Sequence, residues 1–302
     1  MSLFSHCAGV ATVAAALLGI AAPASAHGVA GSRFFPATIA TDDPAVADEL
    51  SLSTLSTFKD ADGQSITNVS GEWSKRLTST LGVSFGDGWT KVGHESGFEN
   101  LETTLKYQFL TSAEHEAIVS AGLGVEWGGT GAARIGAEKM SAVIPTLYFG
   151  KGFGDLPDST GLLRPFAVTG LVGYSIPTKA HEQAAEDGAP ERTTRSLEYG
   201  LSVEYSMRYL ATQVKDYGLG DFVNRLTPLV EVALETPVAN GHGERTTGTV
   251  NPGLLWSGRR MQLGFEAQVP VNRDSGRTVG ALFQVHWFLD DLFPNSLGMP
   301  LW

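Results

Sequence analysis

Long segments in which apolar and polar residues alternate one by one constrain the fold of this chain more than any other feature. Within residues 101–109, Leu101, Leu105 and Phe109 fall on one face, and Glu102 falls on the other. Side chains of a β-strand point alternately to its two faces, so the pattern predicts a strand with an apolar face and a polar face. The same alternation recurs in four further segments, which are 117–127, 197–209, 261–269 and 279–287.

Weaker alternation between these segments predicts seven more strands, at 50–58, 65–77, 79–87, 141–151, 162–174, 226–237 and 246–256. The total is about twelve strands of roughly 9–13 residues, the length that a tilted strand needs to cross a bilayer. Strands of soluble sandwiches usually have about 5–6 residues. We therefore predict an all-β fold, a transmembrane antiparallel up-and-down β-barrel of about 12 strands, and a count of about ten or fourteen stays open.

A soluble antiparallel sheet also alternates, with its apolar face buried, but three observations favour a membrane barrel. Aromatic residues gather near the ends of the apolar faces, where an interfacial girdle lies in such barrels; these are Tyr107, Phe109, Trp127, Tyr205 and Tyr209. The polar faces are rich in Gly and Ser, which suits a tight lumen better than a solvated surface. The third observation is an export signal.

The connections between the predicted strands alternate in length. Short links fall near Thr78, at 111–114 and at 257–260, whereas longer polar links fall at 88–98, 128–140, 177–193 and 238–245. Short periplasmic turns and long outer loops are typical of outer-membrane barrels. Two links on the periplasmic side, 152–161 and 210–225, are longer than this rule predicts.

Residues 1–26 contain no Asp, Glu, Lys or Arg, and their apolar stretch ends in Ala24-Ser25-Ala26. A small-x-small sequence after such a stretch is typical of a signal-peptidase site. We therefore predict a signal peptide at 1–26, a mature chain that starts at His27, and a location in the cell outer membrane. A transmembrane anchor is the alternative, but Pro23 ends the apolar stretch before the ~20 residues that a spanning helix needs.

Composition excludes several classes of function. The formal net charge of −11 argues against a nucleic-acid partner, because phosphate binding needs a basic surface. The single Cys excludes a disulfide framework and a thiolate zinc site.

The patterns divide the chain into four regions. Residues 1–26 form the signal peptide, 27–49 a periplasmic N-terminal segment and candidate lumen plug, 50–289 the β-barrel, and 290–302 a C-terminal extension. The run Phe34-Phe35-Pro36 of the N-terminal segment is a candidate for docking in the mouth of the lumen.

The polar faces of the predicted strands are acidic, and they point into the lumen if the apolar faces point to lipid. The candidate lumen-lining residues are Glu72, Glu102, Lys106, Glu116, Glu126, Glu198, Glu204, Arg208, Glu231, Glu235, Glu266, Gln268, Gln284 and His286, with Arg76 as a further inward cation. An open path lined by carboxylates attracts cations and repels anions, because a narrow pore focuses the electric field. The leading hypothesis is passive or gated passage of small solutes with a preference for cations. In the alternative, these carboxylates pair with Arg, Lys, Ser and Tyr inside a plugged structural or binding barrel.

Enzymatic functions receive little support, and we predict no catalytic residue, no cofactor and no metal site. A lipid-active outer-membrane enzyme needs a Ser beside a His, and His286, or His115 with Ser112 nearby, are the candidates on the strands. An N-terminal His27 followed by Gly28 resembles the start of copper-dependent polysaccharide monooxygenases, and imidazole and amine nitrogens do suit copper. No second His stands in a matching context.

The last predicted strand carries the motif Thr278-x-Gly280-x-x-Phe283-x-Val285. This motif resembles the insertion signal of outer-membrane barrels, which implies outer-membrane lipid and the barrel-assembly machinery as partners. With this motif and the alternating strands, the region 50–289 resembles Gram-negative outer-membrane β-barrel proteins. It is most similar to transporter-like barrels of the MetA pathway of phenol degradation and to related uncharacterised barrels. The opening His27-Gly28-x-x-Gly31-x-Arg33-Phe34-Phe35-Pro36 is similar to the start of some exported barrels. The resemblance implies a location and a shape, and it leaves the solute open.

Overall fold

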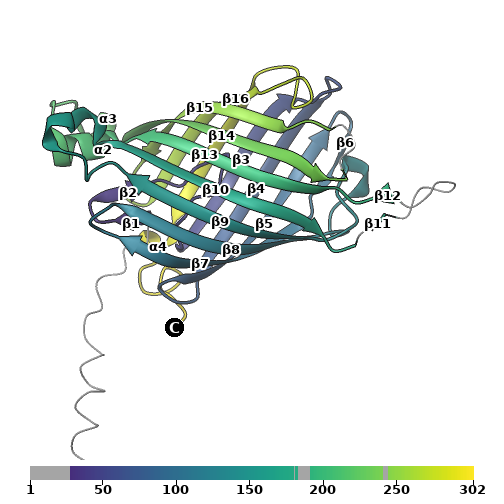
Figure 1. Cartoon of the computed structure of the whole chain (residues 1–302), viewed down its shortest axis with the longest axis horizontal. Coiled ribbons are helices and arrows are strands. Elements are labelled where there is room, and N and C mark those ends of the chain that lie inside the picture. Colours follow the sequence, from purple (N-terminus) through teal and green to yellow (C-terminus); the bar gives the residue numbers. More distant parts are fainter. Residues whose placement is uncertain (1–27, 180, 183–190, 241–243) are drawn as a thin grey trace, which may run out of the picture.

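The chain folds into a closed antiparallel barrel of 12 strands with few helices (Figure 1). The computed structural model describes residues 28–179, 181–182, 191–240 and 244–302. Strand β17 (Gly280–Phe288) pairs with strand β3 (Glu49–Lys59), and this pairing closes the ring. The predicted all-β up-and-down barrel is therefore confirmed. The predicted signal peptide at 1–26 and the predicted mature N-terminus at His27 lie outside the described residues.

The other barrel strands are β4 (Ser65–Arg76), β5 (Leu81–Val92), β7 (Leu101–Ser112), β8 (Ala117–Trp127), β9 (Ala142–Gly152), β10 (Phe166–Pro177), β13 (Arg195–Tyr205), β14 (Leu226–Ala239), β15 (Thr247–Ser257) and β16 (Met261–Pro270). Each pairs with its neighbours along the chain, as an up-and-down barrel requires. The interval 88–98, predicted as a loop, is largely strand, because β5 runs on to Val92 and pairs with the short β6 (Glu95–Phe98).

Ten short elements among the described residues are not part of the barrel wall. They are β1 (Gly28–Ala30), β2 (Arg33–Phe35), η1 (Ala133–Ile135), η2 (Asp158–Leu163), β11 (His181–Glu182), β12 (Glu191–Arg192), α2 (Met207–Tyr209), η3 (Leu210–Val214), α3 (Asp221–Asn224) and α4 (Leu289–Leu292). No helix in the described ranges is long and apolar enough to span a bilayer.

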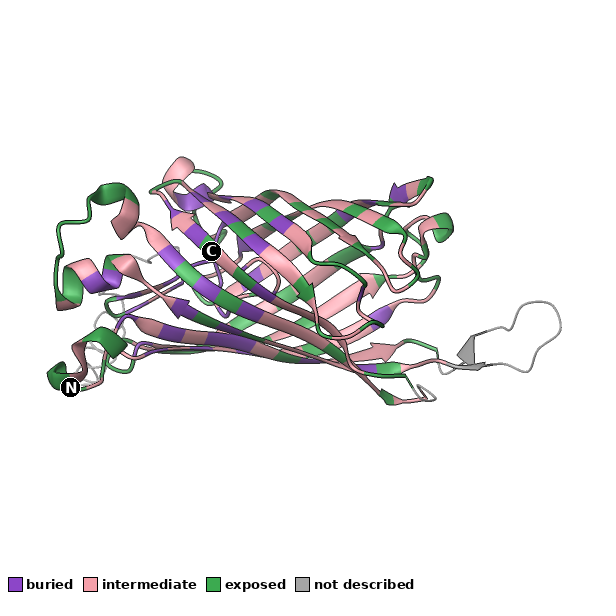
Figure 2. Cartoon of the chain, turned by 90° about the horizontal axis from the view of Figure 1, so that it is seen from above, coloured by how far each residue is buried: buried purple, intermediate pink, exposed green. Residues whose placement is uncertain are grey.

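The barrel is apolar outside and polar inside, and Figure 2 shows how burial alternates along its strands. The outward side chains of Leu105 and Leu147 are 47% and 50% exposed, whereas the inward Ser202 and Glu266 are both 0% exposed. In a soluble sheet the apolar side chains are buried and the polar side chains are exposed. The arrangement is that of a membrane barrel, whose lipid-facing band is apolar and whose interior is polar.

Strand β13 ends at Tyr205, before the end that alternation over 197–209 predicts. The cause is local: the hydroxyl of Ser206 accepts a hydrogen bond of 3.1 Å from the N–H of Tyr209 and caps α2. Arg208 therefore lies exposed on a helix, and the prediction that it lines the lumen from a strand is wrong. The prediction that Tyr209 belongs to the outer aromatic girdle is also wrong, because this side chain is only 4% exposed.

Candidate functional site

Residues 28–48, here called the inner segment, run inside the barrel at the end where β3 begins. The segment ends at Asp48, whose carboxylate is fully buried. One of its oxygens lies 2.7 Å from Nζ of Lys75, and the other lies 2.7 Å from Nε of Arg76. The C-terminal extension covers this site, because the carbonyl of Gly298 accepts a hydrogen bond from Arg76. The inner segment is thus fixed to the barrel wall where it enters β3.

Arg33 on β2 forms a second anchor of the inner segment. Its guanidinium is 1% exposed, and its Nε lies 3.1 Å from Oε2 of Glu116. The other guanidinium nitrogens donate to the carbonyls of Arg164 and Pro165, and the group lies 3.9 Å from the ring centre of Tyr209. Glu116 also accepts a hydrogen bond of 2.8 Å from the Tyr209 hydroxyl. This network explains why Tyr209 is buried at the barrel end rather than exposed to lipid.

Glu231 on β14 holds the middle of the inner segment. Its carboxylate accepts hydrogen bonds from the backbone N–H groups of Ile39, Ala40 and Thr41 at 2.8, 3.1 and 2.8 Å. The Thr41 hydroxyl donates a fourth bond of 2.8 Å. A carboxylate with so many donors is fully hydrogen-bonded although it is buried.

Inward-facing glycines make room for this part of the chain. A Cβ at Gly200 would lie 2.5 Å from Cγ2 of Thr41, and a Cβ at Gly264 would lie 2.3 Å from Cδ1 of Ile39. Both contacts are shorter than side chains tolerate. The Gly content of the polar faces therefore has a structural reason, because bulkier residues at these positions would displace the inner segment.

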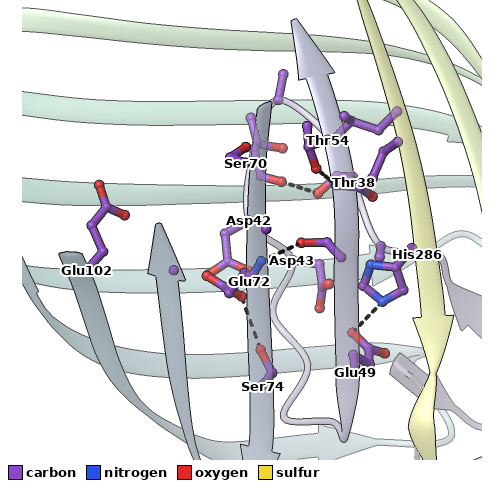
Figure 3. A pocket seen from close by; sticks show the side chains of 18 of the residues that line it. Thr38, Asp42, Asp43, Glu49, Thr54, Ser70, Glu72, Ser74, Glu102 and His286 are labelled. Atoms are coloured by element: carbon purple, nitrogen blue, oxygen red, sulfur yellow. Dashed lines mark hydrogen bonds and ion pairs between the residues drawn. The ribbon is translucent and has the colours of Figure 1, made fainter. Parts of the chain in front are cut away.

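A cavity of about 370 Å³ lies on the side of the inner segment that faces away from Arg33. Asp42 and Asp43 project into it from the inner segment, and Glu72 and Glu102 line it from the wall (Figure 3). Nζ of Lys106 lies 2.8 Å from an Asp42 oxygen and donates to the Asp43 carbonyl at 2.9 Å. The cavity therefore holds several carboxylates around one lysine, and that lysine is already paired.

Two further groups of the cavity have defined partners. Nε2 of His286 lies 3.0 Å from Oε2 of Glu49, and the Ser74 hydroxyl donates to Glu72 at 3.0 Å (Figure 3). Burial inside the barrel raises the pKa of Asp43 to about 7, with nearby Lys106 opposing the shift. Asp43 is therefore a carboxyl whose charge changes near neutral pH.

From the wall of this cavity onward, the barrel strands bring carboxylates together in pairs. Glu102 lies directly opposite Glu126 on the neighbouring strand, and Glu198 lies directly opposite Glu235. Asn100 donates to Glu126 at 2.7 Å. Glu102, Glu198 and Glu235 have no hydrogen bond or ion pair with any described residue. Carboxylates directly opposite each other on adjacent strands repel when both are charged, which destabilises a sheet.

The predicted lumen residues thus separate into groups. Those in or beside the part that the inner segment fills are Glu116, Glu204, Glu231 and Glu266, together with Gln284 and His286 at its border. Those in the unfilled part are Glu72, Glu102, Glu126, Glu198, Glu235 and Gln268, and Lys106 lies where the two parts meet. Asp42, Asp43 and Glu49 are site residues that the alternation does not identify. The two aspartates lie in the inner segment, which has no periodic pattern, and Glu49 begins β3 one residue before the predicted strand at 50–58.

Neither the His115 ring nor the His286 ring is hydrogen-bonded to a serine hydroxyl among the described residues. The His115 side chain is 60% exposed, with Nδ1 3.4 Å from an Asp155 oxygen. The Ser112 hydroxyl accepts a hydrogen bond from the His115 backbone N–H. Within the described ranges, no three His, Cys, Asp or Glu side chains are close enough to hold a metal ion.

No protein-family model and no curated protein sequence matches this chain. Solved barrels with a similar shape include an outer membrane channel from Pseudomonas putida F1, with 12% identity over 84% of this chain and 99% of that chain and a TM-score of 0.49. The KdgM porin is similar at 11% identity over 79% of this chain and 98% of that chain, with a TM-score of 0.45. The NanC porin has 10% identity over 78% of this chain and 98% of that chain, with a TM-score of 0.47. At these values the likeness is one of barrel shape and carries no statement about function.

Proposed function

We propose that this protein is an outer-membrane channel that passes small solutes, with a preference for cations, past an inner segment seated in its lumen. The observation that carries the proposal is the group of carboxylates without cations in the unfilled part of the barrel. Glu102, Glu198 and Glu235 line this part from three strands and find no positive partner among the described residues. Such a wall concentrates cations and excludes anions.

The location rests on the outer surface of the barrel. An apolar band around a closed ring of strands removes every strand edge and suits the hydrocarbon core of a bilayer. We expect the mature chain to appear in the outer-membrane fraction as a heat-modifiable band. Replacing the outward Leu201 or Phe265 with Arg is expected to impair insertion, at a cost of roughly 2–4 kcal/mol near the midplane. Recovery of the wild type as a soluble periplasmic protein would contradict this location.

Reversal potentials in a salt gradient across a planar bilayer test the cation preference. The wild-type potential is expected to have the sign of cation selectivity. The double variant Glu102→Gln with Glu198→Gln is expected to move it toward zero. The change should be larger near 0.01 M salt than near 1 M, since the screening length falls from about 30 Å to about 3 Å.

A matched control comes from the filled part of the barrel. Glu204 and Glu266 were equally good selectivity candidates by sequence, but they are 2% and 0% exposed. The double variant Glu204→Gln with Glu266→Gln should leave the reversal potential close to the wild-type value while the inner segment stays seated. Equal effects of the two double variants would contradict the assignment of selectivity to the unfilled part.

A second candidate function is a closed structural or binding barrel, and the buried Arg33–Glu116 network favours it. A segment held by buried ion pairs at both of its ends resists displacement, and a channel must leave a path beside it. The finer resemblance to barrels of the MetA pathway type stays a prediction, as does the barrel-assembly machinery as a partner.

A further inference from the structure

Two connections at the inner-segment end of the barrel are longer than turns of this kind usually are, and they pack together. We call residues 157–164 and 206–225 the end knob; they contain η2, α2, η3 and α3. A side chain added at Gly161 of η2 would lie 3.2 Å from Cγ1 of Val214 in η3, so the two connections are in close contact. Figure 1 shows α2 and α3 projecting beyond the ends of the strands.

The end knob carries large apolar side chains that nothing in the described chain covers. Tyr217, Leu219 and Phe222 are 51%, 46% and 66% exposed, and Leu162 and Leu163 of η2 are exposed as well. Gly218 and Gly220 lie between the first three, with φ of 69° and 82°. These glycines allow a backbone path that most residues avoid. The local chain conformation therefore presents apolar side chains at the surface, where contact with water is unfavourable.

The end knob continues the lipid-facing surface of the barrel. The ring of Phe222 stacks on Trp256 at 6.1 Å between centroids and 26° between planes. Trp256 lies on β15 with Leu254, on the outward face and near the end of the strand. Aromatic residues at strand ends are typical of the membrane interface. Phe222 thus extends the interfacial aromatic surface from the wall onto the knob.

Basic residues lie close to these apolar groups, together with Asp216 and Asp221. Nζ of Lys215 lies 5.0 Å from the ring centre of Tyr217, and long basic side chains of this kind place their charge at the level of lipid headgroups. Arg208 and Arg259 border a cavity of about 450 Å³ beside the knob, and neither forms an ion pair with a described residue. Exposed apolar rings close to guanidinium groups without an ion pair match the two parts of a phospholipid, its acyl chains and its phosphate.

We propose that the end knob binds the phospholipid leaflet on the periplasmic side of the outer membrane, with Tyr217, Leu219 and Phe222 inserted at the interface. The inference rests on the outer-membrane location proposed above. A lipid partner is favoured over a protein because Phe222 of the knob stacks on Trp256 of the outward wall, which faces lipid. The two long connections are then membrane anchors rather than exceptions to the rule of short turns.

Fluorescent labels at single cysteines test this proposal in the full-length exported protein, with Cys7→Ala as background. The variants are Leu219→Cys on the knob, Gln213→Cys as an exposed polar position on the knob, and Leu201→Cys on the barrel wall. Each is reconstituted into vesicles of phosphatidylethanolamine and phosphatidylglycerol that contain a nitroxide-labelled phospholipid. Labels at 219 and 201 are expected to lose most of their emission, and the label at 213 to keep it.

Each of the other quenching results contradicts one specific part of the proposal. Quenching at 201 without quenching at 219 would show that the knob stays in water, and it would leave the membrane location intact. If the label at 219 is not quenched in vesicles but is shielded from iodide in whole cell envelopes, the knob binds a protein of the envelope. That result would contradict the proposal of a lipid partner. Absence of quenching at both positions would contradict the outer-membrane location itself.

Discussion

Two strands of the barrel each carry one glutamate in the filled part of the lumen and one in the unfilled part. On β14, Glu231 holds the backbone of the inner segment by three N–H donors, whereas Glu235 faces another carboxylate. On β13, Glu204 is 2% exposed and contacts the Thr169 hydroxyl at 3.3 Å, whereas Glu198 faces Glu235. Glutamates on the same inward face are thus buried in the filled part of the barrel at one level and line the unfilled part at another.

A side chain that points inward is therefore not always one that lines the conducting path. What differs between the two levels is the inner segment, which brings donors to Glu116 and Glu231 in the filled part. In the unfilled part, Glu102, Glu198 and Glu235 have no hydrogen bond or ion pair with a described residue. Stability is expected to depend on the filled part and ion selectivity on the unfilled part. The predictions below test that division, beginning with the largest expected effect.

Removal of Arg33 is expected to have the largest effect. Arg33→Met leaves the carboxylate of Glu116 buried without its cation, and breaking a buried pair in this way costs about 3–5 kcal/mol. Urea unfolding of the reconstituted barrel measures the loss. Arg225→Met, which breaks an ion pair with the exposed Asp221, is the matched control and should cost at most about 1 kcal/mol. Similar losses in the two variants would mean that the Arg33 network does not anchor the fold.

Substitution by Arg at inward positions should separate the two parts directly. Ser202 is 0% exposed and lies directly opposite Glu231, so Ser202→Arg would occupy the place of the inner segment and compete for that carboxylate. Overpacking of this kind costs roughly 1–3 kcal/mol. Gln268 lies in the unfilled part, and Gln268→Arg should cost less than about 1 kcal/mol. Protease cleavage within 28–48 should rise only in Ser202→Arg, and equal cleavage would contradict the division.

The smallest effect is expected from pH. Asp43 has a pKa of about 7 when the inner segment is seated, against 3.8 in an exposed carboxyl. The seated form therefore keeps a proton that the released form loses, and its stability falls as pH rises from about 4 to 7 and then levels off. Lys106, Asp42 and Glu49 are the charged groups that act on Asp43.

Limited proteolysis of the inner segment at pH 5 and pH 8 measures this dependence. Cleavage should be faster at pH 8 in the wild type, and the difference should shrink in Asp43→Asn. An unchanged difference in Asp43→Asn would assign the effect to another group.

The sequence was sufficient to predict the barrel wall, because alternation is local and each strand shows it independently. It was insufficient for the filled part, where the deciding contacts join distant segments. Thr41 and Glu231 are separated by 190 positions, and Arg33 and Glu116 by 83. The sequence signals closest to these contacts were Gly200 and Gly264, whose missing side chains leave the space. They marked a tight interior, and residues 27–49 were the candidate plug, but no sequence pattern paired particular residues of that segment with the wall. Tyr209 was misplaced because a helix cap at Ser206 overrides an alternating pattern.

The single-channel conductance of the wild type and of a chain without residues 28–47 tests the central claim most directly. This deletion keeps Asp48, so Lys75 and Arg76 retain their partner. The account predicts a low, cation-selective conductance for the wild type and a several-fold larger, still cation-selective conductance after the deletion. A folded barrel that conducts in neither form would contradict it, because the carboxylates of the unfilled part would then be packing groups in a closed structural barrel.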